Sequence, residues 1–485
     1  MDSRVVASGK KLAVTWLRAV ACTGRAPWLF VSASAIAVLL NFEIATAGGA
    51  NPTSTCCSDL EQRIADLEAA QVQTSRRGFE LKVSGSVNQA VLFWDDGGTH
   101  SAAVVTNDND NSTATLEGET RELAGGWSVG FIIDFDLLSS GSSDTNQRAA
   151  GETAFEPGEV SFWIKNEHFG QLSMGLTSAK GSSGGANEAD LSGTEVAAYV
   201  GVTDIGGGFF VRRQNTRGDK SAPGSKASRS DSGLTAMTWN DVIDSLDEPD
   251  GSVISYNSPE LAGFAVSGLW GEDDVWNAGA AYTNKVAGPF TFVAKMAYNE
   301  DLQGALVNSP NDQTLSGSIA LLHVPSGLNL TIAGGERRYT QAVPYNNGTT
   351  GVPASPSFAY LKAGWRAALV DWGDTAVYAE AGRFQDFLGA NAGANIVAGL
   401  AGDLRAASPA APCATATAAC LVSGSDAFIA GAGIVQRFDD ANAQLYLGAR
   451  HYEADVSLVT AKGAKVHSAP LSGFDTVIGG LLIEF

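Results

Sequence analysis

The segment Gly473–Phe485, GFDTVIGGLLIEF, ends the chain. Val477, Gly479, Leu481 and Ile483 occupy alternate positions, and the aromatic Phe485 follows at the same spacing. A period of two places such side chains on one face of a β-strand. A terminal strand with one apolar face and an aromatic last residue is typical of membrane β-barrels.

The same period begins at Phe79 and recurs along the chain. Lys82, Ser84 and Ser86 alternate there with Leu81 and Val83. Further strands are predicted near 112–123, 126–138, 157–167, 169–177, 251–258, 262–271, 274–286, 288–300, 314–324, 327–340, 356–370, 373–386, 425–438, 441–454 and 473–485. The total is about sixteen, and single-chain bacterial barrels have an even number. We therefore predict an all-β fold, a transmembrane antiparallel barrel over residues 79–485.

The predicted connections alternate between short and long. Short turns are predicted at Ala124–Gly125, His168–Gly170, Pro259–Glu260, Ala287–Gly288, Pro325–Ser326, Asp371–Trp372 and Asp439–Asp440. Long connections are predicted at Asp95–Asn111, Ser178–Asp250, Tyr339–Pro356 and Phe387–Gly424. Short turns at one end and long loops at the other are typical of outer-membrane barrels.

Aromatic residues occur near both kinds of connection. Near the short turns these are Trp127, Phe169, Phe290, Trp372, Phe438 and Phe485, and near the long loops Trp94, Trp270, Trp276 and Phe384. Two such groups match the aromatic belts at the two membrane interfaces. Each ring taken alone could equally belong to the core of a soluble protein.

Composition narrows the class of protein. Of 485 residues, 17% are charged and 56 are Gly, which is too apolar for a disordered chain and too rich in Gly for a helical bundle. The 52 acidic residues outnumber the 31 basic ones, giving a net charge of −21. Nucleic acid is therefore not an expected partner, because binding of its phosphates needs a basic surface.

The first 78 residues have a different character. Basic residues precede the apolar run Trp28–Leu40, and Ala45–Ala47 follows it, so we predict a signal peptide over 1–47. A buried N-terminal helix is the alternative. Within a periplasmic spacer at 48–78, Asp59–Thr74 has apolar residues at coiled-coil spacing and predicts a short helix that needs a partner. A frayed spacer helix remains open there.

Cysteine is rare, with 5 residues in the chain. Cys413 and Cys420 lie close enough in sequence to form a local disulfide in an oxidising compartment. Cys56 and Cys57 are adjacent, which strains a bond between them and leaves an intermolecular bridge possible. Because no Cys or His cluster has zinc spacing, we expect neither a metal site nor a cofactor.

Three stretches resemble porins of alphaproteobacterial outer membranes, the rhizobial type in particular. They are Phe79–Gly97 (FELKVSGSVNQAVLFWDDG), Asp190–Thr194 (DLSGT) and Tyr256–Tyr282 (YNSPELAGFAVSGLWGEDDVWNAGAAY). The run from Cys56 to Glu68 is also similar to the N-terminal element of these porins. The resemblance implies a sixteen-stranded homotrimeric barrel in a Gram-negative bacterium, with its longest loop folded inward as a constriction. Gly389–Ser423 matches nothing in the family.

The loop after the fifth strand, at 178–250, is therefore the expected constriction. It carries Glu188, Asp190 and Glu195. Alternation predicts basic residues facing the lumen, because a charge facing lipid near the midplane costs about 2–4 kcal/mol. These residues are Lys165, Lys295, Arg337, Lys362, Arg366 and Arg450. Loop carboxylates facing such bases would create a transverse field. The alternative is that the carboxylates form a solvated loop and the bases lie elsewhere in the lumen.

Other acidic residues suggest the ion preference. Glu117, Glu119, Asp134 and Asp136 alternate inward on the second and third predicted strands, and predict a preference for cations. Glu272–Asp274 could hold divalent cations that bridge lipopolysaccharide, although a solvated loop explains them as well.

No histidine of the chain lies in an HExxH, P-loop or nucleophile-elbow setting, so no enzyme is predicted. The sequence thus predicts an outer-membrane channel for passive diffusion of small hydrophilic solutes and ions. The alternative is a surface adhesin or structural barrel with a plugged lumen.

Overall fold

The computed structural model describes residues 78–485 except 121–122, 152, 179–184, 215–232, 247–249, 272–274, 286–287, 302–310, 346–348, 390–391, 393–395, 398–399, 401–419, 461–462 and 469. The predicted signal peptide, the helix at 59–74, and Cys56 and Cys57 lie outside the described residues.

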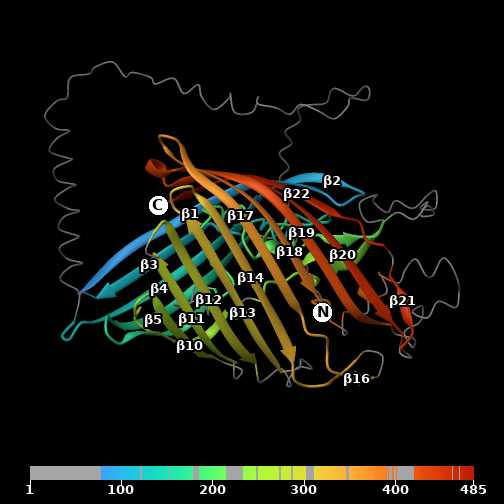
Figure 1. Ribbon diagram of the computed structural model, residues 1–485, viewed down its shortest axis with the longest axis horizontal. Helices are drawn as coiled ribbons and strands as arrows, with labels where there is room; N and C mark the ends of the chain where they lie inside the picture. Colours follow the sequence, from blue (N-terminus) through green and yellow to red (C-terminus); the bar gives the residue numbers. More distant parts are fainter. Residues whose placement is uncertain are drawn as a thin grey trace, which may run out of the picture. The chain divides into compact units, whose positions relative to one another are not determined.

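Antiparallel strands form a closed wall, in which the last strand pairs with the first (Figure 1). The sheet holds 18 strands, of which β2 (His100–Thr106) and β21 (Lys465–His467) only extend neighbouring strands, so 16 make the wall. The wall strands are β1 (Phe79–Asp95), β3 (Thr113–Thr120), β4 (Trp127–Ser139), β5 (Thr153–Asn166), β6 (Gly170–Ser178), β9 (Asp250–Asn257), β10 (Phe264–Gly271), β11 (Val275–Lys285), β12 (Phe290–Asp301), β13 (Asp312–His323), β14 (Leu328–Tyr339), β17 (Ser357–Val370), β18 (Gly373–Gln385), β19 (Leu421–Phe438), β20 (Ala443–Val459) and β22 (Phe474–Glu484). Every predicted strand is confirmed, with small shifts at the ends.

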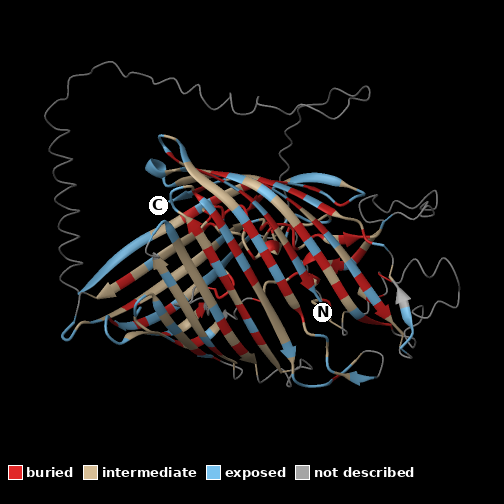
Figure 2. Cartoon of the chain, viewed as in Figure 1, coloured by how far each residue is buried: buried red, intermediate tan, exposed pale blue. Residues whose placement is uncertain are grey.

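Side chains along each strand alternate between the two faces of the wall. On β20, Leu445 and Leu447 are 50% and 51% exposed, whereas Tyr446 between them is buried. Figure 2 shows the pattern as alternating bands of buried and exposed residues along the strands. Large apolar residues are exposed along most wall strands, and buried polar residues line much of the inner face, which is the opposite of a soluble protein. In the part of the chain that the structure describes, no helix has the length and apolar character needed to cross a bilayer.

The prediction of one long connection at Asp95–Asn111 is wrong. A tight turn after β1 leads directly into β2, which pairs with β1 from Asp95↔His100 to Gln89↔Thr106. Residues 107–112 then leave the wall, and β3 continues along β1 below them. The second wall position is thus an interrupted strand, and the polar run Asn107–Ser112 is the interruption.

The described residues between β6 and β9, at 185–214 and 233–246, lie against the inner face of the wall. They contain η2 (Val202–Asp204), β7 (Phe210–Arg212), β8 (Leu234–Thr238) and η3 (Trp239–Asp241). The minor elements elsewhere are β15 (Val343–Pro344), β16 (Thr350–Gly351) and η6 (Asp439–Ala441).

Within this loop, Phe209 and Trp239 pack against Phe474 and Tyr452 of the inner wall, with ring centroids 4.9–5.9 Å apart. An apolar core therefore lies inside the lumen, against β20 and β22.

This core corrects two of the predicted belt aromatics. Trp94 points inward, with its ring 5.1 Å from that of Phe209, and Phe384 is fully buried. Neither lies at a membrane interface. By contrast Trp270, Trp372 and Phe485 are 57–67% exposed on the outside. Alternation fixes only the face of a strand, and here the inner face is apolar because the loop packs on it.

Candidate pore constriction

The loop is tied to the inner wall at Lys362. This residue of β17 is 1% exposed, while its neighbour Leu361 is 46% exposed on the outside. The Lys362 ammonium forms an ion pair with the Asp190 carboxylate and donates to the Ala198 carbonyl at 2.6 Å and the Thr194 hydroxyl at 3.2 Å. One predicted acid and one predicted base therefore meet directly, in a buried contact.

Arg450 makes a second buried tie. Its Nε lies 2.8 Å from Oε1 of Glu380 on β18, and its Nη1 donates to the Val202 carbonyl of the loop at 2.6 Å. The Tyr360 hydroxyl donates to Oε2 of the same Glu380 at 2.7 Å. Sequence reasoning missed Glu380, which lies on an inward position with the parity of Tyr378. Both Lys362 and Arg450 are withdrawn from water, so neither presents a free positive charge to the lumen.

The remaining predicted bases are spread around the barrel. Arg366 of β17 lies near Gly193, with Nη1 3.8 Å from the place of a Cβ at that glycine. Arg337 donates to the Thr314 hydroxyl at 3.1 Å and lies 3.9 Å from Asp312. Lys295 is half-buried on β12, and Lys165 is exposed at the short-turn end, beside a cavity of about 760 Å³.

A polar cavity of about 450 Å³ separates the loop from the opposite part of the inner wall. Its lining includes six acidic residues: Asp108, Asp110, Asp136, Glu188, Glu195 and Asp190, the last of which is paired with Lys362. The inward-folded segment 107–112 brings two of them there, because the Asn107 side-chain amide donates to the Val196 carbonyl at 2.7 Å. Glu188 and Glu195 come from the loop, as the sequence predicted, whereas Asp108 and Asp110 were counted as part of an outer connection.

Burial changes the acidity of these carboxyl groups. Burial raises the pKa of Asp110 to about 6, and the nearby carboxylates of Glu484 and Glu195 add to the shift. The pKa of Glu195 is also raised, first by burial and then by Asp190. Burial likewise raises the pKa of Asp108, against two hydrogen bonds from Ser143. The cavity therefore loses negative charge at mildly acidic pH.

The wall on this side is acidic as well. Asp134 and Asp136 of β4 face inward and pair in register with Glu159 and Glu156 of β5. The neighbouring outward residue, Phe155, is 64% exposed. Glu117 and Glu119 of β3 also face inward, next to outward Leu116. Within the described part of the chain, none of these six carboxylates takes part in an ion pair.

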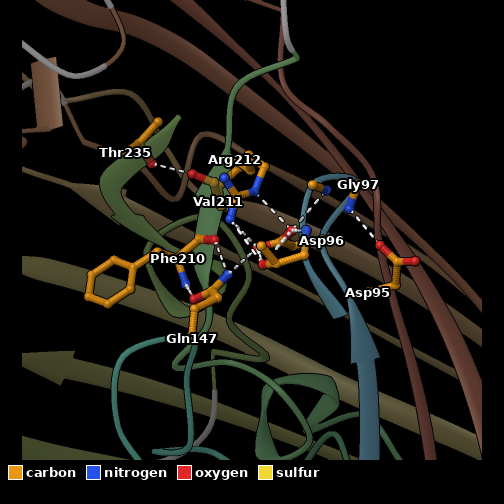
Figure 3. A network of polar contacts seen from close by, with 10 residues as sticks. Asp95, Asp96, Gly97, Gln147, Phe210, Val211, Arg212 and Thr235 are labelled. Atoms are coloured by element: carbon orange, nitrogen blue, oxygen red, sulfur yellow. Dashed lines mark hydrogen bonds and ion pairs between the residues drawn. The ribbon is translucent and has the colours of Figure 1, made fainter. Parts of the chain in front are cut away.

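A third buried ion pair holds the outer part of the loop, and sequence reasoning missed it (Figure 3). Arg212 of β7 donates from Nε to Oδ1 of Asp96 at 2.8 Å and from Nη2 to Oδ2 at 2.9 Å. Gln147, from the connection between β4 and β5, bridges Asp96 and the Phe210 backbone. Arg212 is one of four arginines in the segment 178–250, and nothing in the sequence distinguishes it from the others.

Two further predictions fall at the edge of the described residues. Cys420 is disulfide-bonded, and its predicted partner Cys413 lies outside the described residues. Glu272, Asp273 and Asp274 also lie outside them.

Comparisons with known proteins give a limited result. No family model and no curated protein matches the chain. Similar solved structures include an anion-selective porin from Comamonas acidovorans, with a TM-score of 0.47 and 12% identity, covering 84% of this chain and 100% of that one. The outer membrane channel DcaP of Acinetobacter baumannii has a TM-score of 0.44 and 9% identity, and the match covers 84% of this chain and 98% of that one. Salmonella typhi OmpF, in complex with daunomycin, has a TM-score of 0.44 and 12% identity, with the same coverage of the two chains.

Proposed function

We propose that the chain is an outer-membrane porin, a water-filled channel through which small hydrophilic solutes and ions diffuse passively. The observation that carries this proposal is the closed wall with an apolar outside and a polar inside. A lipid-embedded barrel needs that arrangement, because every backbone polar group of the wall must be paired within the protein. Polar cavities inside the wall, on the side of β3–β6 and β9, provide the path for solutes.

We propose further that the channel prefers cations. Lys362 and Arg450 are neutralised in buried pairs, whereas the carboxylates around the 450 Å³ cavity and on β3–β5 face it or the lumen. Fixed charges on a narrow part of a pore set its field, and the acidic residues of β3–β5 take part in no ion pair among the described residues. The constriction then lies between the Asn187–Val200 segment and β3–β4, with Glu188 and Glu195 on its loop side. Arg366, Arg337, Lys295 and Lys165 moderate the field and do not reverse it.

Planar bilayers with a KCl gradient test both parts of the proposal. The expected result is stepwise conductance with a reversal potential of the sign for K⁺ over Cl⁻. The double substitution Asp134→Asn and Asp136→Asn should lower the K⁺ preference. Asp371→Asn, in a short turn outside the lumen, is the matched control and should leave it unchanged. Anion preference, or equal behaviour of the two variants, contradicts the assignment of the acidic wall.

The second candidate function is a surface adhesin or structural barrel with a plugged lumen. The apolar core of Phe209 and Trp239 inside the barrel favours it, since that core fills one side of the lumen. Liposome swelling with sugars of graded size separates the two functions. Uptake of the smaller sugars supports the channel, whereas no swelling with any of them supports the plugged barrel.

Several finer features belong to the same proposal. We propose that residues 1–47 are removed on export and that 48–78 form a periplasmic element. We also propose that the protein is a porin of the rhizobial type and that it forms a homotrimer. We also propose that Cys413 is the disulfide partner of Cys420, and that Glu272–Asp274 contact lipopolysaccharide through divalent cations. Neither catalysis nor a cofactor is part of the proposed function. His451, on the outer face of β20, contacts the carboxylates of Asp475 and Glu453.

A further inference from the structure

The polar cavity of about 450 Å³ between the loop and the inner wall is lined by residues with unpaired side-chain oxygens. These oxygens are Oδ1 of Asp108, Asn109, Asn111 and Asn187. Each is buried and accepts no hydrogen bond from the described residues, and Asn187 as a whole is only 1% exposed. A buried acceptor without a donor costs about 1–3 kcal/mol, so four of them around one cavity call for an explanation.

The orientation of the three side-chain amides is fixed by their nitrogen atoms. Nδ2 of Asn187 donates to the Ser245 carbonyl at 2.6 Å, and Nδ2 of Asn109 faces two backbone carbonyls of the loop, both at 3.4 Å. The Asn111 side chain forms a hydrogen bond to the Asp136 carboxylate, which only its nitrogen can donate. Rotating any of these amides by half a turn would bring an oxygen against another acceptor. The unpaired atom is therefore the oxygen in all three.

The rest of the lining supplies further oxygens and directs its donors elsewhere. The Asp110 carboxylate accepts no hydrogen bond and forms no ion pair within the described part of the chain. The hydroxyl group of Tyr199 donates to Asp204, and that of Tyr360 donates to Glu380 at 2.7 Å. Neither Lys nor Arg is among the described residues of the lining. The cavity therefore offers acceptors and negative charge to a ligand, which is the chemistry of a cation site.

We propose that this cavity binds a Ca²⁺ ion between the segment 107–112 and the loop residues 187–195. Ca²⁺ takes about six to eight oxygen ligands, from carboxylates, side-chain amides, backbone carbonyls and water. Among the described residues, no three His, Cys, Asp or Glu side chains are grouped so that they could hold a metal ion alone. Amide oxygens must therefore complete the ligand set, which favours a hard cation over zinc. The expectation of no metal site was based on His and Cys spacing, and an all-oxygen site uses neither residue.

A bound ion would act on both sides of the cavity. It would link the loop to the wall and would add two positive charges beside Asp110 and Glu195. Ca²⁺ should therefore lower the preference of the channel for K⁺. This consequence rests on the proposed function, whereas binding of the ion does not. Since most of the unpaired oxygens belong to neutral amides, we expect a dissociation constant of about 10⁻⁴–10⁻³ M.

Equilibrium dialysis with radiolabelled Ca²⁺ tests the site in the purified full-length protein, after treatment with a chelator. Binding should saturate at one ion per chain, and Ca²⁺ should compete for the site at least about tenfold better than Mg²⁺, because Mg²⁺ keeps its water ligands and demands a regular octahedron. Diffuse attraction to acidic side chains does not distinguish the two ions. The absence of saturable binding, or equal competition by Ca²⁺ and Mg²⁺, would overturn the proposal.

Matched variants locate the bound ion. Asp110→Asn and Asp134→Asn each remove one carboxylate, but only Asp110 lines the cavity. We expect Asp110→Asn to weaken Ca²⁺ binding about tenfold and Asp134→Asn to leave it nearly unchanged. Asn109→Ala removes one unpaired oxygen without changing the charge, and should also weaken binding, so it tests the site even if Asp110→Asn does not fold. Equal loss in the two charge variants, or unchanged binding in Asn109→Ala, contradicts the site.

Planar bilayers measure the effect on the channel. In a KCl gradient, millimolar Ca²⁺ on both sides should shift the reversal potential of the wild type and of Asp134→Asn toward lower K⁺ preference, and should shift that of Asp110→Asn much less. An equal shift in all three proteins contradicts the site. Saturable Ca²⁺ binding by a barrel that passes no current would contradict the proposed function and support the site. Conducting channels with K⁺ preference but without Ca²⁺ binding would contradict the site alone.

Discussion

Arg212→Met should release the outer part of the inward loop from the wall. The Asp96 and Arg212 side chains are 3% and 4% exposed, and the guanidinium donates to both carboxylate oxygens and to the Thr99 hydroxyl at 3.1 Å. Burial alone would raise the pKa of Asp96, but the hydrogen bonds from Arg212 and from the Thr99 N–H lower it overall. The pair is therefore ionised at neutral pH, and its contribution is lost only as pH falls through that lowered pKa.

The free-energy cost of Arg212→Met depends on the hydrogen bonds that Asp96 retains in the variant. Removing one member of a buried ion pair costs about 3–5 kcal/mol, because the other charge is left without a partner. Asp96 still accepts hydrogen bonds from the N–H groups of Gly98 and Thr99, at 3.0 and 2.7 Å, and from Gln147 at 3.2 Å. We therefore expect the lower value, about 3 kcal/mol. Since about 1.4 kcal/mol is a factor of ten, the open state of the loop should become about a hundredfold more populated.

Thiol labelling measures this opening directly. Met237 of β8 is fully buried, so a cysteine there, in a chain whose other cysteines are replaced, reacts only when the loop opens. Arg212→Met should raise the maleimide labelling rate of Met237→Cys about a hundredfold. Arg148→Met is the control, because Arg148 is exposed and stacks 4.1 Å from the Phe210 ring, a contact worth about 0.5–1 kcal/mol. Labelling unchanged in Arg212→Met, or raised equally in the control, would refute the anchoring role.

Three further outcomes are expected. Lowering the pH from 7 to 5 should reduce the K⁺ over Cl⁻ preference, because Asp110, with a pKa of about 6, becomes neutral; the reversal potential measures this, and a constant value contradicts the assignment. Lys362→Met leaves Asp190 buried without its cation and should destabilise the loop by about 3–5 kcal/mol. Adding Asp190→Asn should recover part of the lost stability. Current noise or loop labelling would measure both effects. Gly327→Ala should impair barrel folding, measured by heat-modifiability gels, because φ is +71° and a Cβ would lie 1.7 Å from the Arg366 carbonyl oxygen. Gly288→Ala, at a position with φ +128° and open space around the Cβ, should impair folding less.

The fold could be predicted from sequence because the membrane imposes one strict rule on every strand. Lipid on one side and polar lumen on the other make the period of two visible even in short segments such as Leu328–Tyr339. Where that rule is relaxed, prediction fails. Trp94 and Phe384 were placed at the interface because their inner face was assumed to be wet. In the folded chain Phe209 of the loop packs on Trp94, and Phe387 packs on Phe384, and no local pattern predicts either contact.

For the candidate site, the sequence indicates which face of the wall a residue lies on, but not which residues it contacts. Alternation correctly put Lys362 and Arg450 on the inner face, since it depends only on local parity. Which acid Lys362 meets depends on how a segment of some seventy residues folds back, whereas Glu380 meets Arg450 across Gly431 of the strand between them. Asp190 and Glu380 are 172 and 70 positions away from their partners, and such long-range pairing leaves no trace in one sequence.

The pairing of Lys362 and Arg450 with carboxylates bears directly on the proposed ion preference. A count of inward charges treats Lys362 and Arg450 as cations of the lumen and predicts a field across the pore. In the structure both cations form buried ion pairs and hydrogen bonds that hold the loop. The electric field of a buried charge is small beyond the opposite charge with which it is directly paired. The carboxylates that stay near water, Asp134 and Asp136 on the wall and Asp110 and Glu195 at the cavity, then act without opposing charges of equal number. Anchoring the loop with bases therefore supports the proposed cation preference more strongly than a count of the inward residues does. The double variant Lys362→Met with Asp190→Asn separates these roles, because removing the whole pair leaves the net charge unchanged and should loosen the loop while shifting the reversal potential little.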